Sequence, residues 1–210
     1  MNETKKTGST VSGAMAWSEQ VSMSQEEIDE FLSGRWLCRL ATLRKDGSPY
    51  NAPAWYYWDG VCLFLMLTSN RLTCKNLLND PRCAAIIDMD DRPLMGMRKN
   101  LAKAVHIAGK ATVITRESGE EIQFEGGPWK GFQAFDECRL TMLGRYGFWE
   151  RDGVLGLSTD KLRELVFDED DIKGSQLEKD HVQRVIVKIR PDRVQAWDFS
   201  KAPFGRQDGD

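Results

Sequence analysis

Hydrophobic and polar residues follow a strand-like pattern along much of the chain. Arg35–Arg44, Tyr50–Trp58 and Arg82–Met89 are short apolar-rich segments, and Ala102–Thr115 is a longer one. Val61–Leu67 is a continuous apolar run of strand length, which predicts a strand that is buried on both faces. The pattern therefore predicts a chain that is mainly β.

Turn residues divide these segments. Lys45-Asp46-Gly47 and Asp59-Gly60 predict two tight hairpins. Pro49 and Pro53 cannot donate ladder hydrogen bonds, so the second strand is expected to be irregular or at a sheet edge. Gly109 is a candidate β-bulge in the long strand.

The C-terminal part shows a similar pattern. Val182–Ile189 alternates as a strand, Pro191-Asp192 is expected to turn the chain, and Arg193–Phe199 is expected to form the last strand.

Two short helices interrupt the strands. Ser24-Gln25-Glu26-Glu27 is a capping box, and apolar residues follow at helical spacing within Ile28–Leu32. Gly34 is expected to end this helix. Arg71–Leu78 predicts the second helix, which Asn79-Asp80-Pro81 would end.

The length of 210 residues fits one domain. We expect a flexible N-terminal arm over 1–20, a single domain over 21–200 and a loose tail over 201–210. Residues 117–174 have the weakest pattern and are interpreted as a variable, partly helical insertion. Short antiparallel strands with tight hairpins favour a barrel over a parallel α/β sheet.

Composition narrows the possible partners. The formal net charge is -3, which gives no support to a nucleic-acid or membrane partner. The chain contains no apolar run of membrane-spanning length and no signal-peptide pattern, so a cytoplasmic protein is expected. Five cysteines without a CxxC pair and two histidines indicate no metal site and no catalytic residue.

The segment Leu67–Asn76 is the first candidate for chemistry. It passes from a buried strand into a helix, and the N-terminus of a helix attracts phosphate. The alternative is an ordinary N-cap serine followed by two solvated basic residues. The hydroxyl and basic side chains in question are Thr68, Ser69, Arg71, Thr73 and Lys75.

Asn51–Trp58 is the second candidate. It ends in four consecutive aromatic residues that could line a flat cofactor. Aromatic residues in strands more often fill a core or an interface, and that alternative remains open.

These segments together resemble the pyridoxamine 5′-phosphate oxidase-like family, the FMN-binding split β-barrels. The order and spacing are similar over residues 24–115 and 182–199. The motifs that carry the resemblance are Leu40-Ala41-Thr42-Leu43, Asp46-Gly47-Ser48-Pro49-Tyr50, Pro53-Ala54-Trp55, Trp58-Asp59-Gly60, Lys75–Arg82, Gly109-Lys110-Ala111, Ile189–Val194 and Trp197-Asp198-Phe199.

The resemblance implies a six-stranded antiparallel split barrel of Greek-key type with flanking helices. It also implies a homodimer with FMN at the subunit interface, although some relatives bind a deazaflavin coenzyme or heme. Asn51–Ala54 would follow the flavin ring, Met66–Thr68 would lie near the ribityl chain and phosphate, and Trp197 would come from the other subunit. The expected cofactor-binding residues are Asn51, Ala52, Pro53, Ala54, Trp55, Met66, Leu67, Thr68, Ser69, Arg71, Thr73, Lys75 and Trp197.

The sequence also departs from the family. Ala52 and Tyr57 stand where the oxidases have an arginine and a lysine on the second strand, and Leu72-Thr73 stands in place of an Arg-Lys pair. The substrate motif after Trp197 is missing. Pyridoxamine phosphate is therefore not the expected substrate, and Arg71 and Lys75 are candidates to replace the lost phosphate charges.

The leading hypothesis is an oxidoreductase in which FMN or a deazaflavin exchanges a hydride with a small planar substrate. One alternative is a non-catalytic flavin- or heme-binding module of the same fold, with His106 as the candidate heme ligand. Another is a degenerate barrel that serves dimerisation or regulation.

Overall fold

The structure is a computed structural model, and it describes residues 17–89, 102–115, 118, 121–122, 129–130, 138, 142 and 183–202. The helices are α1 (Trp17–Gln20), α2 (Gln25–Ser33) and α3 (Leu72–Asn79), with a 3-10 helix η1 (Phe199–Lys201). The strands are β1 (Cys38–Leu43), β2 (Pro49–Ala54), β3 (Tyr57–Trp58), β4 (Leu63–Thr68), β5 (Arg82–Met89), β6 (Lys103–Ile114), β7 (Glu121–Ile122), β8 (Trp129–Lys130) and β9 (Arg184–Asp198).

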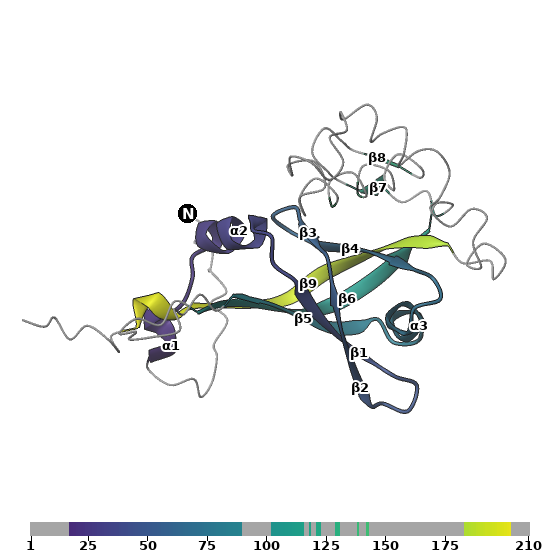
Figure 1. The fold of residues 1–210 in the computed structure, drawn as a ribbon, viewed down its shortest axis with the longest axis horizontal. Coiled ribbons are helices and arrows are strands. Elements are labelled where there is room, and N and C mark those ends of the chain that lie inside the picture. Colours follow the sequence, from purple (N-terminus) through teal and green to yellow (C-terminus); the bar gives the residue numbers. More distant parts are fainter. Residues whose placement is uncertain are drawn as a thin grey trace, which may run out of the picture.

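Seven of the described strands form one antiparallel sheet in the order β2-β1-β5-β6-β9-β4-β3. The sheet curls into a half-barrel (Figure 1), which confirms the expected split β-barrel with flanking helices. It has six longer strands, the number that the resemblance implies, and the two-residue β3 is added at one end. Two of the segments predicted from the sequence, Val182–Ile189 and Arg193–Phe199, are joined in β9. β7 and β8 pair separately.

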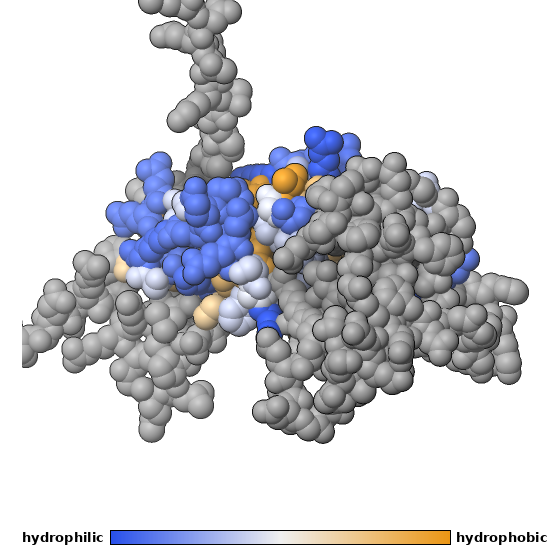
Figure 2. All heavy atoms as spheres, turned by 90° about the horizontal axis from the view of Figure 1, so that it is seen from above, coloured by the Kyte–Doolittle hydropathy of each residue, from blue (hydrophilic) through white to orange (hydrophobic). Residues whose placement is uncertain are grey.

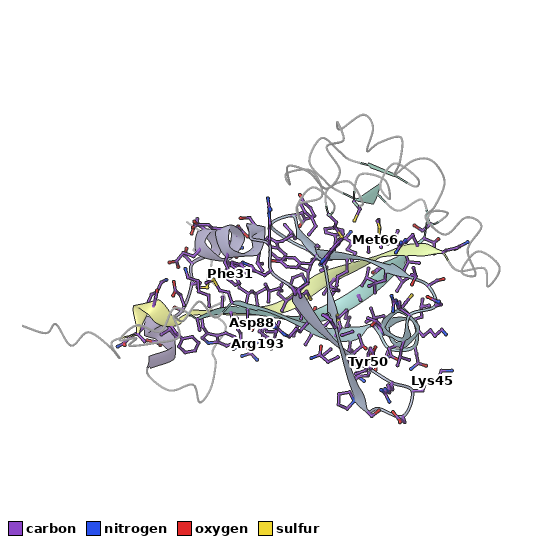
Figure 3. The ribbon with its side chains drawn as sticks, in the orientation of Figure 1. Phe31, Lys45, Tyr50, Met66, Asp88 and Arg193 are labelled. Atoms are coloured by element: carbon purple, nitrogen blue, oxygen red, sulfur yellow. The ribbon has the colours of Figure 1, made fainter. Side chains whose placement is uncertain are left out.

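The two predicted hairpin turns and the two predicted helices are confirmed. Gly47 and Gly60 have φ of 81° and 91°, the left-handed conformation that the β1–β2 and β3–β4 hairpins require. In α2, the Ser24 hydroxyl accepts from the Glu27 N–H, and the Glu27 carboxylate accepts from the Ser24 N–H. Phe31 points from α2 toward the sheet (Figure 3).

The solvent side of α2 is hydrophilic, as the space-filling view shows (Figure 2). Because the opposite side is apolar, the helix covers one end of the core, while α3 lies at another end of the curled sheet (Figure 1). The two helices are thus held by the same set of buried side chains.

The return segment Tyr50–Trp58 was wrongly predicted as one strand. β2 ends at Ala54, and β3 pairs with β4 instead of β1. The chain leaves the ladder at fully buried Tyr56, whose hydroxyl donates to the Leu32 carbonyl of α2 at 3.0 Å. The predicted edge position of β2 is confirmed.

The turn predicted at Pro191-Asp192 is also wrong, because β9 is continuous. The register with β6 shifts between Ala108 and Gly109, so Asp192 is the extra residue of a β-bulge. The irregularity thus lies at Gly109, as predicted, but the extra residue is on β9 and not on the long strand β6. A Cβ on Gly109 would overlap the carbonyl oxygen of Arg190, so the close approach of the two strands requires glycine there.

Strand β4 is buried on both faces, as its apolar run predicts. Leu63 and Leu65 belong to the main core, while Phe64 packs in a second cluster with Ile114 and Ile186. β4 is therefore a rigid wall on which the adjoining loop and α3 are built.

Candidate functional site

A cavity of about 560 Å³ lies between β2 and β4, which come from the two ends of the curled sheet. Figure 3 shows Tyr50 on β2 and Met66 on β4. The start of α3 and the start of β9 complete the lining. The lining residues are Leu37, Tyr50, Ala52, Pro53, Ala54, Trp55, Met66, Leu67, Thr68, Arg71, Thr73 and Arg184.

The β2 wall of the cavity is apolar. Tyr50, Ala52 and Ala54 alternate with more exposed neighbours and face the same side as the buried positions of β1. The small alanine side chains leave room beside the strand. Trp55 adds an aromatic side chain that is 39% exposed. An apolar wall of this kind suits a flat ring system.

The end of the cavity at the β4–α3 turn is polar and positively charged. Thr68 and Thr73 are buried hydroxyl residues, and Arg71 is the N-cap residue of α3. The Arg71 side chain makes no capping hydrogen bond to this helix. The first N–H groups of α3 carry the partial positive charge of a helix N-terminus, to which Arg71 adds a full charge.

The structure brings together most of the residues expected to bind a cofactor. Those that line the cavity are Ala52, Pro53, Ala54, Trp55, Met66, Leu67, Thr68, Arg71 and Thr73. They come from β2 and the residue that follows it, from β4, and from the start of α3. Their role in binding a cofactor stays a prediction.

Four expected residues do not line the cavity of this chain. Asn51 is on the exposed side of β2, and Lys75 is exposed one turn further along α3. Ser69 instead joins two segments, because its hydroxyl accepts from the Gln183 N–H at 3.0 Å. Trp197 lies near the other end of β9; its expected role in a second subunit stays a prediction.

The sequence analysis missed three lining residues. Tyr50 could have been found, because it lies two residues before Ala52 and therefore on the same face of β2. Leu37 lies just before β1 and is 46% exposed. Arg184 lies opposite Thr68 in the β4–β9 ladder, a pairing that nothing local in the sequence indicates.

Arg71 and Arg184 are the charged side chains among the described residues that line the cavity, and no described lining residue is acidic. An arginine does not lose its proton in a protein. The described part of the cavity therefore carries a positive charge that attracts anions.

The cysteines are unsuited to nucleophilic chemistry. Burial raises the pKa of Cys38 and of Cys83 to about 12, and it also raises the pKa of Cys74 on α3. Their thiols are therefore protonated near neutral pH. Among the described residues, no three His, Cys, Asp or Glu side chains are grouped so that they could hold a metal ion.

The insertion expected over residues 117–174 falls almost entirely outside the described residues. The helices that the structure describes are all too short or too polar to cross a membrane.

Comparison with known proteins gives a family. A search of curated proteins finds no match. Among solved structures, the chain is similar to the conserved hypothetical protein Rv2991 from Mycobacterium tuberculosis, with 23% identity, a TM-score of 0.60 and coverage of 87% of this chain and 89% of that one. It is also similar to HutZ, the heme storage protein from Vibrio cholerae, with 14% identity, a TM-score of 0.51 and coverage of 83% and 96%.

At these identities the structural likeness shows the fold alone. The family model described as pyridoxamine 5′-phosphate oxidase matches residues 24–131, which is just over half of the chain and includes most of the cavity lining. The chain therefore belongs to the pyridoxamine 5′-phosphate oxidase family.

Proposed function

We propose that the cavity binds a flavin-type cofactor, FMN or a deazaflavin coenzyme, and that the protein is an oxidoreductase acting on a small planar substrate. The observation that carries this proposal is the cavity itself. It joins an apolar, aromatic wall on β2 to a hydroxyl- and arginine-lined end at the start of α3.

The residues present fit such a cofactor in size and in chemistry. A volume of about 560 Å³ falls within the range of about 300–1,000 Å³ that is usual for small-molecule sites. Ala52, Ala54 and Trp55 would hold the ring system. Arg71 and Thr73 would hold the phosphate through charge-assisted and hydroxyl hydrogen bonds. The Thr68 hydroxyl donates to the Asn70 side-chain oxygen at 2.8 Å, so Thr68 would line this end without donating to the phosphate.

The departures from the family affect this fit only in part. Tyr57 packs against Phe64, with ring centroids 6.3 Å apart, and is not a lining residue, so its lack of charge does not alter the cavity. Thr73 does line the cavity and offers a hydroxyl without a charge. Arg71 is one position before the aligned pair and restores one positive charge at this end.

A bound flavin or deazaflavin supplies the hydride chemistry. The chain's own residues would position the two reactants and keep water away from the apolar wall. None of the described lining residues is a carboxylate or an imidazole that could act as a general acid or base near neutral pH. We therefore expect the acceptor to be a flat molecule that needs no protonation by a side chain.

We further propose that the protein is a cytoplasmic homodimer. Ile86, His106 and Gln195 lie opposite one another on the outer face of β5, β6 and β9, and Ile86 is 43% exposed. Asp88 and Arg193 lie on the same face (Figure 3). Trp197 belongs to this face, so it would reach the cavity of the partner and not its own.

The dimer can be tested by light scattering coupled to gel filtration. We expect a dimeric mass for the wild type and a smaller mass for Ile86→Lys, which places a charge on the proposed interface. Leu78→Lys, at an exposed aliphatic position on α3, is the matched control and should leave the mass unchanged. A monomeric wild type would refute the dimer.

Cofactor binding is tested by titrating the purified protein with FMN, with the deazaflavin coenzyme and with heme, following tryptophan fluorescence and absorption. We expect one flavin-type ligand per chain at micromolar affinity. Ala52→Leu, which fills the cavity, should abolish binding, whereas Ala202→Leu, at a half-buried site elsewhere, should not.

Three other outcomes decide against parts of the proposal. A Soret band that is lost in His106→Ala would favour the heme-binding module. Flavin binding without turnover of any planar acceptor would favour the non-catalytic flavin module. Binding of none of the three ligands would refute the proposed site and favour a degenerate barrel that serves dimerisation or regulation.

A further inference from the structure

Arg184 is a charged residue of the cavity that comes from a part of the chain remote from α3. It is the first residue of β9 and lies opposite Thr68, the last residue of β4. Its side chain is half-buried, and its Nε atom is shielded from solvent. Arg71 lines the same cavity from the β4–α3 turn, so two arginines from two different parts of the chain line one volume.

A pair of hydrogen bonds fixes the position of Arg184 relative to this turn. The Ser69 N–H donates to the Gln183 carbonyl at 2.8 Å, and the Gln183 N–H donates to the Ser69 hydroxyl at 3.0 Å. Gln183 immediately precedes Arg184, and Ser69 lies two residues before Arg71. The two arginines are therefore held in register by a backbone connection, and not only by their flexible side chains.

From this arrangement, and resting on the proposed function, we propose that Arg184 and Arg71 together bind the phosphate group of the flavin-type ligand, with Ser69 as a positioning residue. A guanidinium presents a planar fork of N–H donors that matches two phosphate oxygens. Forks from two elements can hold different oxygens of the same phosphate. The second charge that the family places on the phosphate helix is thus supplied here by β9.

The ligand class that follows is a flavin or deazaflavin carrying a phosphate at the end of its side chain. A phosphomonoester and a phosphodiester share this chemistry, and FMN and the deazaflavin coenzyme are the respective probes. Riboflavin and the phosphate-free deazaflavin riboside keep the ring and lack the phosphate. The ratio of affinities within each pair isolates the phosphate contribution from binding of the ring.

The test measures these two ratios by tryptophan fluorescence titration of wild type, Arg184→Gln, Arg71→Gln and the control Arg190→Gln. Arg190 is an exposed arginine on the same strand and is not a lining residue. Loss of one charge-assisted contact is expected to lower affinity for the phosphorylated ligand by about 10- to 100-fold. Riboflavin affinity should not change, and the control should match the wild type.

Two further variants keep the test decisive if Arg184→Gln does not fold. Arg184→Lys keeps the charge without the planar fork. It should retain only part of the wild-type preference for the phosphorylated ligand over the ligand without phosphate. Ser69→Ala keeps both arginines and removes one of the two hydrogen bonds to Gln183, so it should lower the ratio by a smaller factor. A purely structural role would weaken riboflavin and FMN binding equally and leave the ratio unchanged.

The inference and the proposed function fail in different ways. If the wild type prefers FMN to riboflavin and Arg184→Gln keeps that preference, the role of Arg184 is wrong and the cavity remains a flavin site. If the wild type binds FMN and riboflavin equally, and the deazaflavin pair equally, the phosphate-binding role of both arginines is wrong. If it binds none of the four, both proposals are wrong.

Discussion

Thr42 and Asn76 form a buried hydrogen bond that ties α3 to the sheet. The Asn76 amide of α3 donates to the Thr42 hydroxyl of β1 at 3.0 Å. Asn76 is only 4% exposed and Thr42 only 2%. Replacing Thr42 with valine keeps the shape of the side chain and removes the acceptor. The Asn76 amide would then be left in the interior without this partner.

The expected cost follows from that burial. Leaving a buried donor unsatisfied costs about 1–3 kcal/mol in free energy of unfolding, more than the net value of an exposed hydrogen bond. For a domain of about this size, each kcal/mol lowers the melting temperature by about 2–4 °C. Because α3 carries Arg71 and Thr73, a shift of this helix should also weaken binding of phosphorylated ligands.

The assay is urea denaturation followed by tryptophan fluorescence, with thermal melting by circular dichroism as a second probe. The control is Thr112→Val, the same substitution at an exposed position on β6. We expect a loss of about 1–3 kcal/mol for Thr42→Val and less than about 0.5 kcal/mol for the control. Equal stability of the two variants would refute the reasoning that this hydrogen bond holds α3 in place.

Three further predictions concern the bulge, an ion pair and a buried thiol. Gly109→Ala should destabilise the protein by about 1–3 kcal/mol in the same urea assay, because its Cβ would overlap backbone atoms of β9; unchanged stability would contradict the close approach. Hydrogen bonds from the Arg82 side chain, and then from the Arg82 backbone N–H, lower the pKa of Asp80 from 3.8 to about 2. The contribution of the Asp80 carboxylate to stability should therefore be present above pH 3.8 and be lost as the pH falls toward 2. Carboxyl NMR titration should show the lowered pKa, and Arg82→Gln should raise it. Cys38, whose pKa burial raises to about 12, should resist alkylation at pH 8 until denaturant is added; peptide mapping that finds it modified in the native protein would contradict its burial.

Local signals were sufficient for most of the elements. The Ser24 capping box, the glycine turns at Gly47 and Gly60 and the apolar run of β4 each depend on neighbouring residues, and each was predicted correctly. These features follow from backbone geometry within a few residues, which a sequence displays directly.

The errors arose where distant segments decide the local structure. Tyr56 interrupts the return strand because its hydroxyl reaches the carbonyl of Leu32 in α2. Pro191-Asp192 has the composition of a turn, yet the long pairing with β6 keeps β9 continuous and absorbs Asp192 as a bulge. Arg184 was not predicted as a lining residue for the same reason. Its place beside Thr68 depends on the pairing of two strands that are more than 100 residues apart in the sequence.

The distribution of charge in the cavity has a consequence for the substrate. Both lining arginines are at or near the end formed by Thr68 and the start of α3, while Ala52 stands where the oxidases place a basic residue on the second strand. A second anionic group against this wall would lose its hydration without gaining a counter-charge from β2, and burial of an unpaired charge is costly. In the proposed function, a cofactor phosphate at the arginine end would leave only the neutral wall for the acceptor. We therefore expect an uncharged planar substrate, which agrees with the presence of Ala52 in place of a basic residue.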